Sequence, residues 1–348
     1  MEHESLALLE ALLHIPSLSG QEAEAAAFLV DRMAGYGWEA TVDAAGNAVG
    51  LVGHEGPLVV LLGHIDTVPG AIPVRVEAGC LYGRGAVDAK GPFATFIQAT
   101  RRAELAGRLR CRVALVGATE EEAASSKGAH YVRERYAPAY CVIGEPSGWN
   151  RVTLGYKGRL LVHYRLEQAS AHSAGELPAA PESLVAFWRE VEAHCAAHNA
   201  GRERLFDQLI PSLRQVASGG DGLTDWCTAT IGLRLPEGID PACLADDLRA
   251  LAGAAHVRFE GGCPAFRSPR TTPLASAFLR SIRAHGGQPA FLHKTGTADM
   301  NVVGPAWNCP IVAYGPGDSR LDHTPNEHIV ISEYFQAIEV LAEVLGQL

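Results

Sequence analysis

Histidine and carboxylate side chains recur in short motifs along this chain, close to points where an apolar run ends. Three of these runs predict buried strands, at 58–62, 111–117 and 139–143. The side chains that could do chemistry are His64, Asp66, Glu121, Glu122 and Glu145 close after these runs, Asp88 just before a helix, and His323 downstream of a later strand. Open α/β sheets bind ligands at the carboxyl ends of their strands. We therefore expect these groups to gather at one edge of a sheet and to bind metal ions.

A pair of divalent metal ions is the chemistry that fits these ligands. Imidazole and carboxylate groups suit zinc best, tolerate cobalt or manganese, and without thiolates do not resemble a structural zinc site. Two ions about 3.5–4 Å apart need a bridging carboxylate, terminal ligands and a base for the bridging water. The five candidate ligands are His64, Asp88, Glu122, Glu145 and His323. Glu121 remains as the base, and Asp66 can accept the second N–H of the His64 imidazole.

Each motif is weak by itself. Most His-x-Asp pairs lie on surfaces, a run of glutamates commonly begins an exposed helix, and Gly-Glu-Pro alone is a turn. Their common position after the strands of one sheet strengthens the prediction, because crowded acidic groups repel one another unless cations lie between them.

The elements that would position these groups alternate along the chain. Helices are predicted at 92–106 and 127–136, between the three strands, and this order indicates an α/β fold with a mixed sheet flanked by helices. Ser19 to Glu22 has the spacing of a capping box, which predicts a helix from there to about Gly35. Two further strands, 38–42 and 48–52, flank a Gly-Asn turn and predict a hairpin.

The pattern changes in the middle of the chain. This α+β stretch has predicted strands at 160–166, 228–235 and 256–260, and predicted helices at 182–198 and 239–252 between them. The earlier alternation of helices and apolar strands then resumes, with a helix at 273–284 and a strand at 310–314. We therefore expect a catalytic domain made of residues 1–157 and 268–348, with a second domain, 158–267, inserted into it.

Composition excludes several classes of protein. The net charge of −10 argues against bulk nucleic-acid binding, and no apolar run approaches the roughly 18 residues that span a membrane. The acidic first residues lack the basic region of a signal peptide, so we expect a cytoplasmic protein. The charge is uneven, however, because residues 146–166 and 261–298 contain arginine and lysine but no acid.

The motifs, taken together and in this order, resemble the dinuclear zinc aminoacylase and carboxypeptidase family, which includes acetylornithine deacetylase and succinyl-diaminopimelate desuccinylase. The resemblance covers nearly the whole chain. It rests on Gly63 to Pro69, Gly83 to Gly91, the acidic triplet Glu120 to Glu122, Gly144 to Pro146, and the late His323-Thr324-Pro325-x-Glu327. It implies a hydrolase with a catalytic domain and an inserted lid that forms a homodimer.

The resemblance also implies roles for the site residues. His64, Asp88 and Glu145 would hold one metal ion, and Asp88 would bridge to a second ion held by Glu122 and His323. Glu121 would be the general base. The family usually has Asp-Glu-Glu at the triplet, so a register shifted by one residue, with Glu120 as the base and Glu121 as a ligand, stays open.

Further residues enter only through the resemblance. His172, in Ala-His-Ser, would reach across the dimer to stabilise the oxyanion. Arg234 would bind a substrate carboxylate, although the aspartate that usually precedes it by two residues is Gly232 here. The segment with Lys294, Gly296 and Thr297 corresponds to the family's glycine-rich substrate loop.

Two segments, 120–128 and 294–301, resemble one subgroup in particular. That subgroup releases lysine or ornithine from the γ-carboxyl of the C-terminal glutamate of a small acidic amino-group carrier protein, in lysine or arginine biosynthesis. The acid-free stretches would suit such a partner. The alternatives are a deacetylase for acetylornithine or acetyllysine, a general carboxypeptidase and, more remotely, a metal-free binding protein with the same fold.

Overall fold

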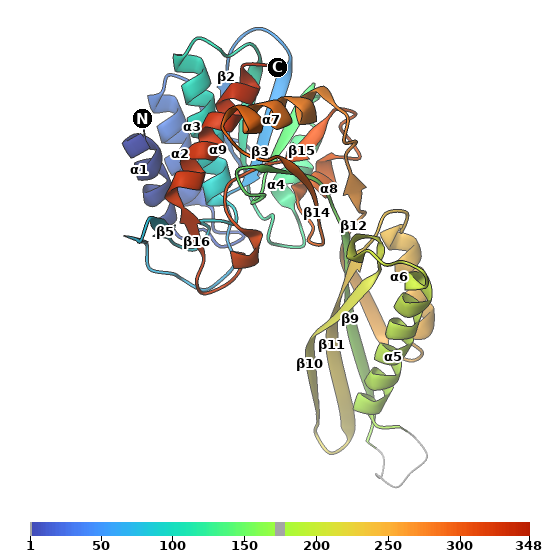
Figure 1. Cartoon of the computed structure of the whole chain (residues 1–348). Coiled ribbons are helices and arrows are strands. Elements are labelled where there is room, and N and C mark those ends of the chain that lie inside the picture. Colours follow the sequence, from blue (N-terminus) through green and yellow to red (C-terminus); the bar gives the residue numbers. More distant parts are fainter. Residues whose placement is uncertain (1, 171–177) are drawn as a thin grey trace. The chain divides into compact units, whose positions relative to one another are not determined.

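The computed structural model of the chain describes residues 2–170 and 178–348 (Figure 1). The chain divides into two compact units. Unit 1 contains Met1–Gly155, Ser268–His293 and Ala298–Leu348, and unit 2 contains Tyr156–Arg267 with the short segment Lys294–Thr297. No helix in the described ranges is both long enough and apolar enough to cross a membrane.

Unit 1 contains most of a nine-stranded mixed sheet, so the predicted fold class is confirmed. The strand order is β1-β2-β6-β3-β7-β15-β8-β13, with β14 paired to β8. The strands are β1 (Glu39–Val42), β2 (Ala48–Val52), β3 (Leu58–His64), β6 (Arg112–Ala118), β7 (Tyr140–Gly144), β8 (Arg151–Tyr156), β13 (Phe266–Arg267), β14 (Ala290–Lys294) and β15 (Ile311–Ala313). Strands β6, β3, β7 and β15 are parallel neighbours, and the predicted hairpin forms as β1 and β2.

Helices and a small sheet complete unit 1. They are α1 (Glu2–Leu13), α2 (Ala23–Gly35), α3 (Lys90–Leu105), α4 (Lys127–Arg133), α7 (Pro273–Ala284), α8 (Asp299–Val303), α9 (Ile331–Leu345), a 3-10 turn at Ser319–Leu321, and β4 (Arg75–Glu77), β5 (Cys80–Tyr82) and β16 (His328–Val330). In β3, Val59 and Leu61 join the core shared with α3 and α9, whereas Val60 and Leu62 are buried on the other face. Both faces of the sheet are therefore covered, as a continuously apolar strand predicts.

The capping box predicted at Ser19 is not formed. Helix α2 begins at Ala23, its N-cap residue is Glu22, and no side chain caps it. The Ser19 hydroxyl instead donates a hydrogen bond to the Asp66 carboxylate, 2.7 Å away. The spacing was correct for a helix start, but a buried acid from another strand end competes more strongly for the hydroxyl than the free N–H groups of the helix do.

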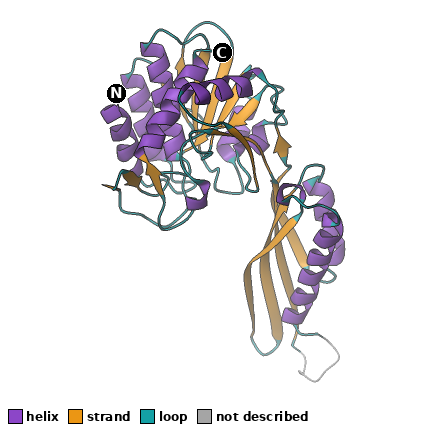
Figure 2. Ribbon diagram, viewed as in Figure 1, coloured by secondary structure: helices purple, strands orange, loops and turns teal. Residues whose placement is uncertain are grey.

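Unit 2 is a four-stranded antiparallel sheet with two helices on one face (Figure 2). The strand order is β10-β11-β9-β12. The elements are β9 (Gly158–Ala169), α5 (Ala180–Asn199), a 3-10 turn (Leu205–Asp207), β10 (Ile210–Gly220), β11 (Thr224–Leu235), α6 (Pro241–Leu251) and β12 (His256–Cys263). The prediction of three strands missed β10, because this edge strand is almost entirely exposed and has no buried apolar alternation.

Candidate metal centre

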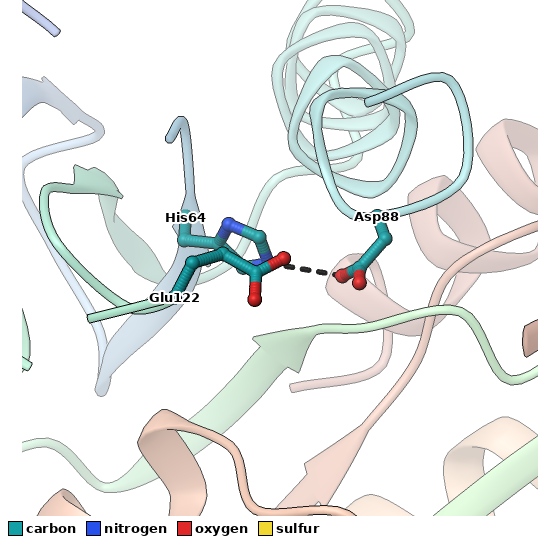
Figure 3. A group of neighbouring side chains, drawn as sticks. All are labelled: His64, Asp88 and Glu122. Carbon is teal, nitrogen blue, oxygen red and sulfur yellow. Dashed lines mark hydrogen bonds and ion pairs between the residues drawn. The ribbon is translucent and has the colours of Figure 1, made fainter. Parts of the chain in front are cut away.

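The carboxyl ends of three neighbouring strands bring the predicted side chains of unit 1 together. His64 is the last residue of β3, Glu145 directly follows β7, and Glu121 and Glu122 follow β6 within four residues. Since these strands are parallel neighbours, their ends meet at one edge of the sheet. Asp88 precedes α3, and its side chain points toward His64 and Glu122 (Figure 3).

Asp88 lies between two histidines and contacts each through a different oxygen. Its Oδ1 is 3.1 Å from His64 Nε2, and its Oδ2 is 3.0 Å from His323 Nε2. Glu145 Oε1 lies 3.9 Å from the same nitrogen of His64, and Glu122 Oε1 lies 2.8 Å from the same nitrogen of His323. The five side chains thus form two groups that share Asp88. Ligand atoms of His64, Asp88 and Glu122 all lie within 4.8 Å of one another.

Asp66 orients this cluster from behind. It is fully buried, and its carboxylate accepts hydrogen bonds from the backbone N–H groups of Glu121 and Glu122, both at 3.1 Å, and from the Ser19 hydroxyl at 2.7 Å. Its backbone oxygen is 3.0 Å from His64 Nδ1. A proton on Nδ1 leaves the Nε2 lone pair of His64 available for a metal ion, which is the tautomer that a metal ligand requires.

Glu327 orients the loop that carries Asp88, and sequence reasoning did not include it among the site residues. It is fully buried. Its Oε1 accepts the backbone N–H groups of Val87 and Asp88 at 2.9 and 3.1 Å, and its Oε2 accepts the guanidinium of Arg84 at 2.7 Å. The signal was present, because Glu327 is the last residue of the late His-Thr-Pro-x-Glu motif.

The charges of the cluster disturb one another strongly. Burial raises the pKa of Glu121 well above its ordinary range, and the nearby carboxylates of Glu145 and Asp299 raise it further. Burial alone would lower the pKa of His64, but its contacts with Asp66 and Asp88 hold that pKa well above normal. Hydrogen bonds to Asp88 and Glu122 likewise raise the pKa of His323 to about 10.

These shifts test whether the residues suit a metal. In the metal-free cluster, several acids lie together without sufficient positive charge. Glu121 and both imidazoles therefore keep their protons to higher pH. Divalent cations supply that charge and replace the protons of the ligand histidines, since metal ligands must be deprotonated. The donor set of imidazole and carboxylate groups therefore fits one or two divalent ions.

Glu120 has different partners from its two neighbours. Its Oε2 accepts the Ser125 hydroxyl at 2.6 Å, and its Oε1 lies 3.6 Å from Lys127 Nζ at the start of α4. Glu120 adopts a left-handed backbone conformation, with φ of 57°, and the chain turns there between β6 and the two glutamates that contact Asp66. The carboxylate of Glu120 is thus engaged by a serine and a lysine.

Asp299 was also overlooked as a site residue. It lies at the start of α8, is almost fully buried, and acts on Glu121 through its charge. The sequence gave a hint, since Asp299 is part of the 294–301 segment that resembles the substrate loop.

The predicted substrate-binding residues belong to unit 2. The Arg234 guanidinium donates to the Thr297 hydroxyl at 2.9 Å, and that hydroxyl donates to the backbone oxygen of Lys157 at 2.9 Å. The backbone oxygen of Lys294 accepts the N–H of Lys157, and the space around Gly296 is open. These contacts fasten the segment 294–297 to unit 2. His172 lies outside the described residues.

Comparisons with known proteins agree with this geometry. The family model described as peptidase family M20/M25/M40 matches residues 60–347. The chain is 49% identical over 348 residues to a LysW-lysine hydrolase from Deinococcus radiodurans, covering 98% of this chain and 96% of that protein. It is 24% identical over 292 residues to a LysW-lysine/LysW-ornithine hydrolase from Saccharolobus solfataricus, covering 83% of this chain and 81% of that protein.

Solved structures share the fold over almost the full length. An M20 family metallo-carboxypeptidase from Sulfolobus solfataricus superposes with a TM-score of 0.82 at 20% identity, covering 99% of this chain and 98% of that one. A dinuclear metal-binding M20 peptidase from Bacillus subtilis superposes with a TM-score of 0.72 at 12% identity, covering 99% and 97%. The chain therefore belongs to the M20/M25/M40 peptidase family and is a hydrolase of amide bonds.

Proposed function

We propose that this enzyme releases lysine, ornithine or both from the γ-carboxyl of the C-terminal glutamate of the carrier protein LysW. The observation that carries the proposal is the likeness to the Deinococcus radiodurans LysW-lysine hydrolase, 49% identical over nearly the whole of both chains. The cluster around Asp88 supports the chemistry, because it gathers the ligands and the base that cleavage of an amide requires.

In this proposal the cluster holds two divalent ions, with zinc best suited to the ligands and cobalt or manganese tolerated. His64 and Glu145 would hold one ion, Glu122 and His323 would hold the other, and Asp88 would contribute to both. The contact of each Asp88 oxygen with a different histidine supports that division. When bound, the ions polarise the scissile carbonyl and lower the pKa of a water molecule.

Glu121 is the proposed general base. It removes a proton from the attacking water and delivers it to the nitrogen of the leaving amino acid, so that the amide is cleaved to a free amine and the γ-carboxylate of the carrier. Its burial beside the proposed ligands places it where it could both accept and return a proton. Asp66 helps to position it by fixing its backbone N–H.

The contacts of the triplet support this register over the shifted one. Glu122 lies 2.8 Å from His323 Nε2, whereas Glu120 is bound to Ser125 and Lys127. A base at Glu120 would have to break both of those contacts.

Unit 2 is the proposed lid and dimerisation domain. Its edge strand β10 exposes the apolar side chains Leu213 and Val216, which an edge-to-edge contact with a second copy would cover. In the dimer, His172 of one subunit would donate a hydrogen bond to the oxyanion in the other. Arg234, Lys294, Gly296 and Thr297 would bind the released part of the substrate or the terminal glutamate.

The proposal is tested by amino-acid release from four substrates. Zinc-loaded enzyme is given lysine or ornithine linked to LysW, and acetyllysine or acetylornithine, each over a range of concentrations. A higher kcat/KM for the LysW-linked pair supports the proposal. A higher kcat/KM for the acetylated pair assigns the chain to the deacetylases, and preferential cleavage of C-terminal peptide bonds assigns it to the carboxypeptidases.

A further inference from the structure

Unit 2 has a second functional surface, which is the face of its sheet that the helices leave open. Strand residues alternate between the two faces. In β9, Leu160, Val162 and Tyr164 belong to the core under α5 and α6, so His163 and Arg165 point the other way. Within the described part of this unit, no helix packs on that other face (Figure 2).

Strand pairing brings basic residues from distant parts of the sequence together on this open face. Arg258 of β12 lies opposite His163, and His256 lies opposite Arg165. Arg214 comes from β10, at a register irregularity between Leu213 and Gln215, and its side chain lies directly over Gly232. Several of these side chains line a depression of about 700 Å³ on the face.

The charge of the open face is opposite to that of the chain. Its basic residues are Arg159, His163, Arg165, Arg214, Arg234, His256 and Arg258, and its acidic residues are Glu167 and Glu260. The whole chain, in contrast, carries 39 acidic residues against 29 lysines and arginines. Glu167 pairs with Arg165 and Glu260 with Arg258, whereas Arg214 forms no ion pair with a described residue.

The composition of the face resembles a protein-binding surface. All its permanent cations are arginines, and arginine is enriched in interfaces whereas lysine is depleted. Threonines 228 and 230 of β11 lie between the basic residues, so the face offers hydrogen-bonding groups together with charge. Arginine also binds carboxylates through two parallel hydrogen bonds, which gives orientation as well as attraction.

We infer that the open face of unit 2 docks the acidic surface of the carrier protein whose C-terminal residue enters the active site. This inference rests on the proposed function. The catalytic residues need to contact only the terminal glutamate and its amino acid, so the folded body of a carrier requires a surface elsewhere. A basic surface on an otherwise acidic enzyme steers and orients an acidic partner.

Two other occupants fit the face less well. A nucleic acid would be attracted by the same arginines, but the proposed function gives it no role, so it is an alternative outcome of the test. A second copy of this chain, docked face to face about a twofold axis, would place arginine against arginine. Both occupants predict results that differ from those of a docked carrier.

The test reverses charge on the open face and, in a matched control, on the helical side of unit 2. The test variant is Arg214→Glu with Arg258→Glu. The control is Arg189→Glu on α5 with Arg249→Glu on α6. In each pair one arginine has no ion pair with a described residue and the other has one, Arg258 with Glu260 and Arg249 with Asp246. The net charge change is the same in both variants.

Each enzyme is assayed on two substrates, lysine linked to LysW and lysine linked to the γ-carboxyl of free glutamate. In the test variant, KM for the LysW-linked substrate should rise roughly tenfold or more with kcat unchanged, because the docking charges act on encounter and binding. Both kinetic constants for the small substrate should stay within twofold of wild type. The control should match wild type on both substrates.

Salt dependence gives an independent reading. In wild type, kcat/KM for the LysW-linked substrate should fall as ionic strength rises, and this dependence should be weaker in the test variant. Activity on the small substrate should show no such difference. If charge reversal damages folding, activity on both substrates will fall together. The milder variant Arg214→Gln with Arg258→Gln then tests the inference by the same selective rise in KM for the LysW-linked substrate.

Several outcomes would overturn the inference. The first is a KM for the LysW-linked substrate that is unchanged in both open-face variants, or that rises equally in the control. The second is a DNA or RNA complex that the test variant loses without any change in KM. The third is a sedimentation coefficient that changes in the test variant without any change in KM. A wild-type enzyme that does not prefer the LysW-linked substrate refutes the proposed function instead, and is recognised before any variant is made.

Discussion

The carboxylate cluster of unit 1 and the open face of unit 2 each concentrate charge of one sign, but by different means. Apart from the half-exposed His323, the cluster is largely buried, and backbone N–H groups hold its members through Asp66 and Glu327. On the open face, the side chains of residues such as Arg165 and Arg258 are more than half exposed, and strand alternation and pairing place them together. The first arrangement suits small ions held in fixed geometry, and the second suits a large partner that approaches through water.

Removing the metal should separate the two regions most clearly. A chelator is expected to abolish amide hydrolysis and to lower Tm, because ligand binding to the folded state no longer stabilises it. The open face contains none of the proposed ligands, so the chelated protein should still bind LysW with a similar Kd. Activity, Tm and LysW binding are measured before and after zinc is restored. Full activity in metal-free protein would refute the metal centre, and lost LysW binding would refute the independence of the two regions.

Replacing the base should separate chemistry from metal binding within the cluster. Glu121→Gln is expected to retain two equivalents of zinc while kcat falls roughly 10²- to 10⁴-fold, because the proton acceptor is gone. Zinc content is measured by atomic emission on the same samples that are assayed. Glu120→Gln is the matched control and should stay close to wild type. Loss of one zinc equivalent in Glu121→Gln would instead favour the shifted register, with Glu120 as the base.

Replacing Glu327, which positions Asp88 without binding metal, should lower zinc affinity less than loss of a ligand would, but more than loss of an exposed ion pair. Glu327→Gln removes the charge that holds Arg84 and the backbone of Val87 and Asp88, so zinc affinity should fall roughly 10- to 100-fold. The control is Glu77→Gln, which breaks the exposed pair of Glu77 with Arg75 and should leave affinity unchanged. Equal affinities for the two variants, in a competition titration with a chromophoric chelator, would show that Glu327 does not position Asp88.

The same contrast explains what the sequence could and could not predict. His64, Glu121 and Glu145 were found because each follows its strand within a few residues. Glu327 was missed as a site residue because it acts on backbone N–H groups about 240 positions away, and such a contact has no local sequence pattern. The five ligand candidates do come together, whereas the residues predicted to bind substrate lie in the other unit.

Charge patterning was informative only in part. The acid-free stretch 146–166 does supply Arg159 and Arg165 to the open face, but Arg214 and Arg258 come from outside both stretches. Arg267 of the second stretch is neutralised by Asp207 and Glu237, which are distant in sequence. A basic surface depends on strand pairing as well as on composition, and without strand β10 the sequence could not place Arg214 on this face.

Protons and metal ions should compete inside the cluster, with a modest effect on stability. The pKa of His323 is raised from about 6.5 to about 10 in the metal-free protein. A group with a raised folded pKa stabilises the fold below its unfolded pKa and loses that contribution as pH rises through the folded value. Metal-free protein should therefore lose a few degrees of Tm between about pH 6.5 and 10, because His323 is half exposed and its pairs are partly screened.

Zinc-loaded protein should not follow this trend, since its ligand histidines are already neutral. The gain in Tm on adding zinc should consequently increase with pH over the same interval. His323→Gln should flatten the profile of the metal-free protein. A metal-free Tm that is constant or rises over this range would contradict the assigned contacts of His323 with Asp88 and Glu122.

The smallest expected effect concerns the hydroxyl that was predicted to cap a helix. Ser19→Ala removes one of three hydrogen bonds to the Asp66 carboxylate, and the backbone donors of Glu121 and Glu122 remain. A net loss of about 1.5–3 kcal/mol is typical of one hydrogen bond to a charged group. If it acts through the position of Glu121, kcat should fall several-fold while KM and zinc content stay constant. Ser19→Thr retains the hydroxyl and should restore kcat. A lost N-cap would instead lower Tm through α2 and leave kcat intact, so the two measurements together decide whether Ser19 serves the cluster or the helix.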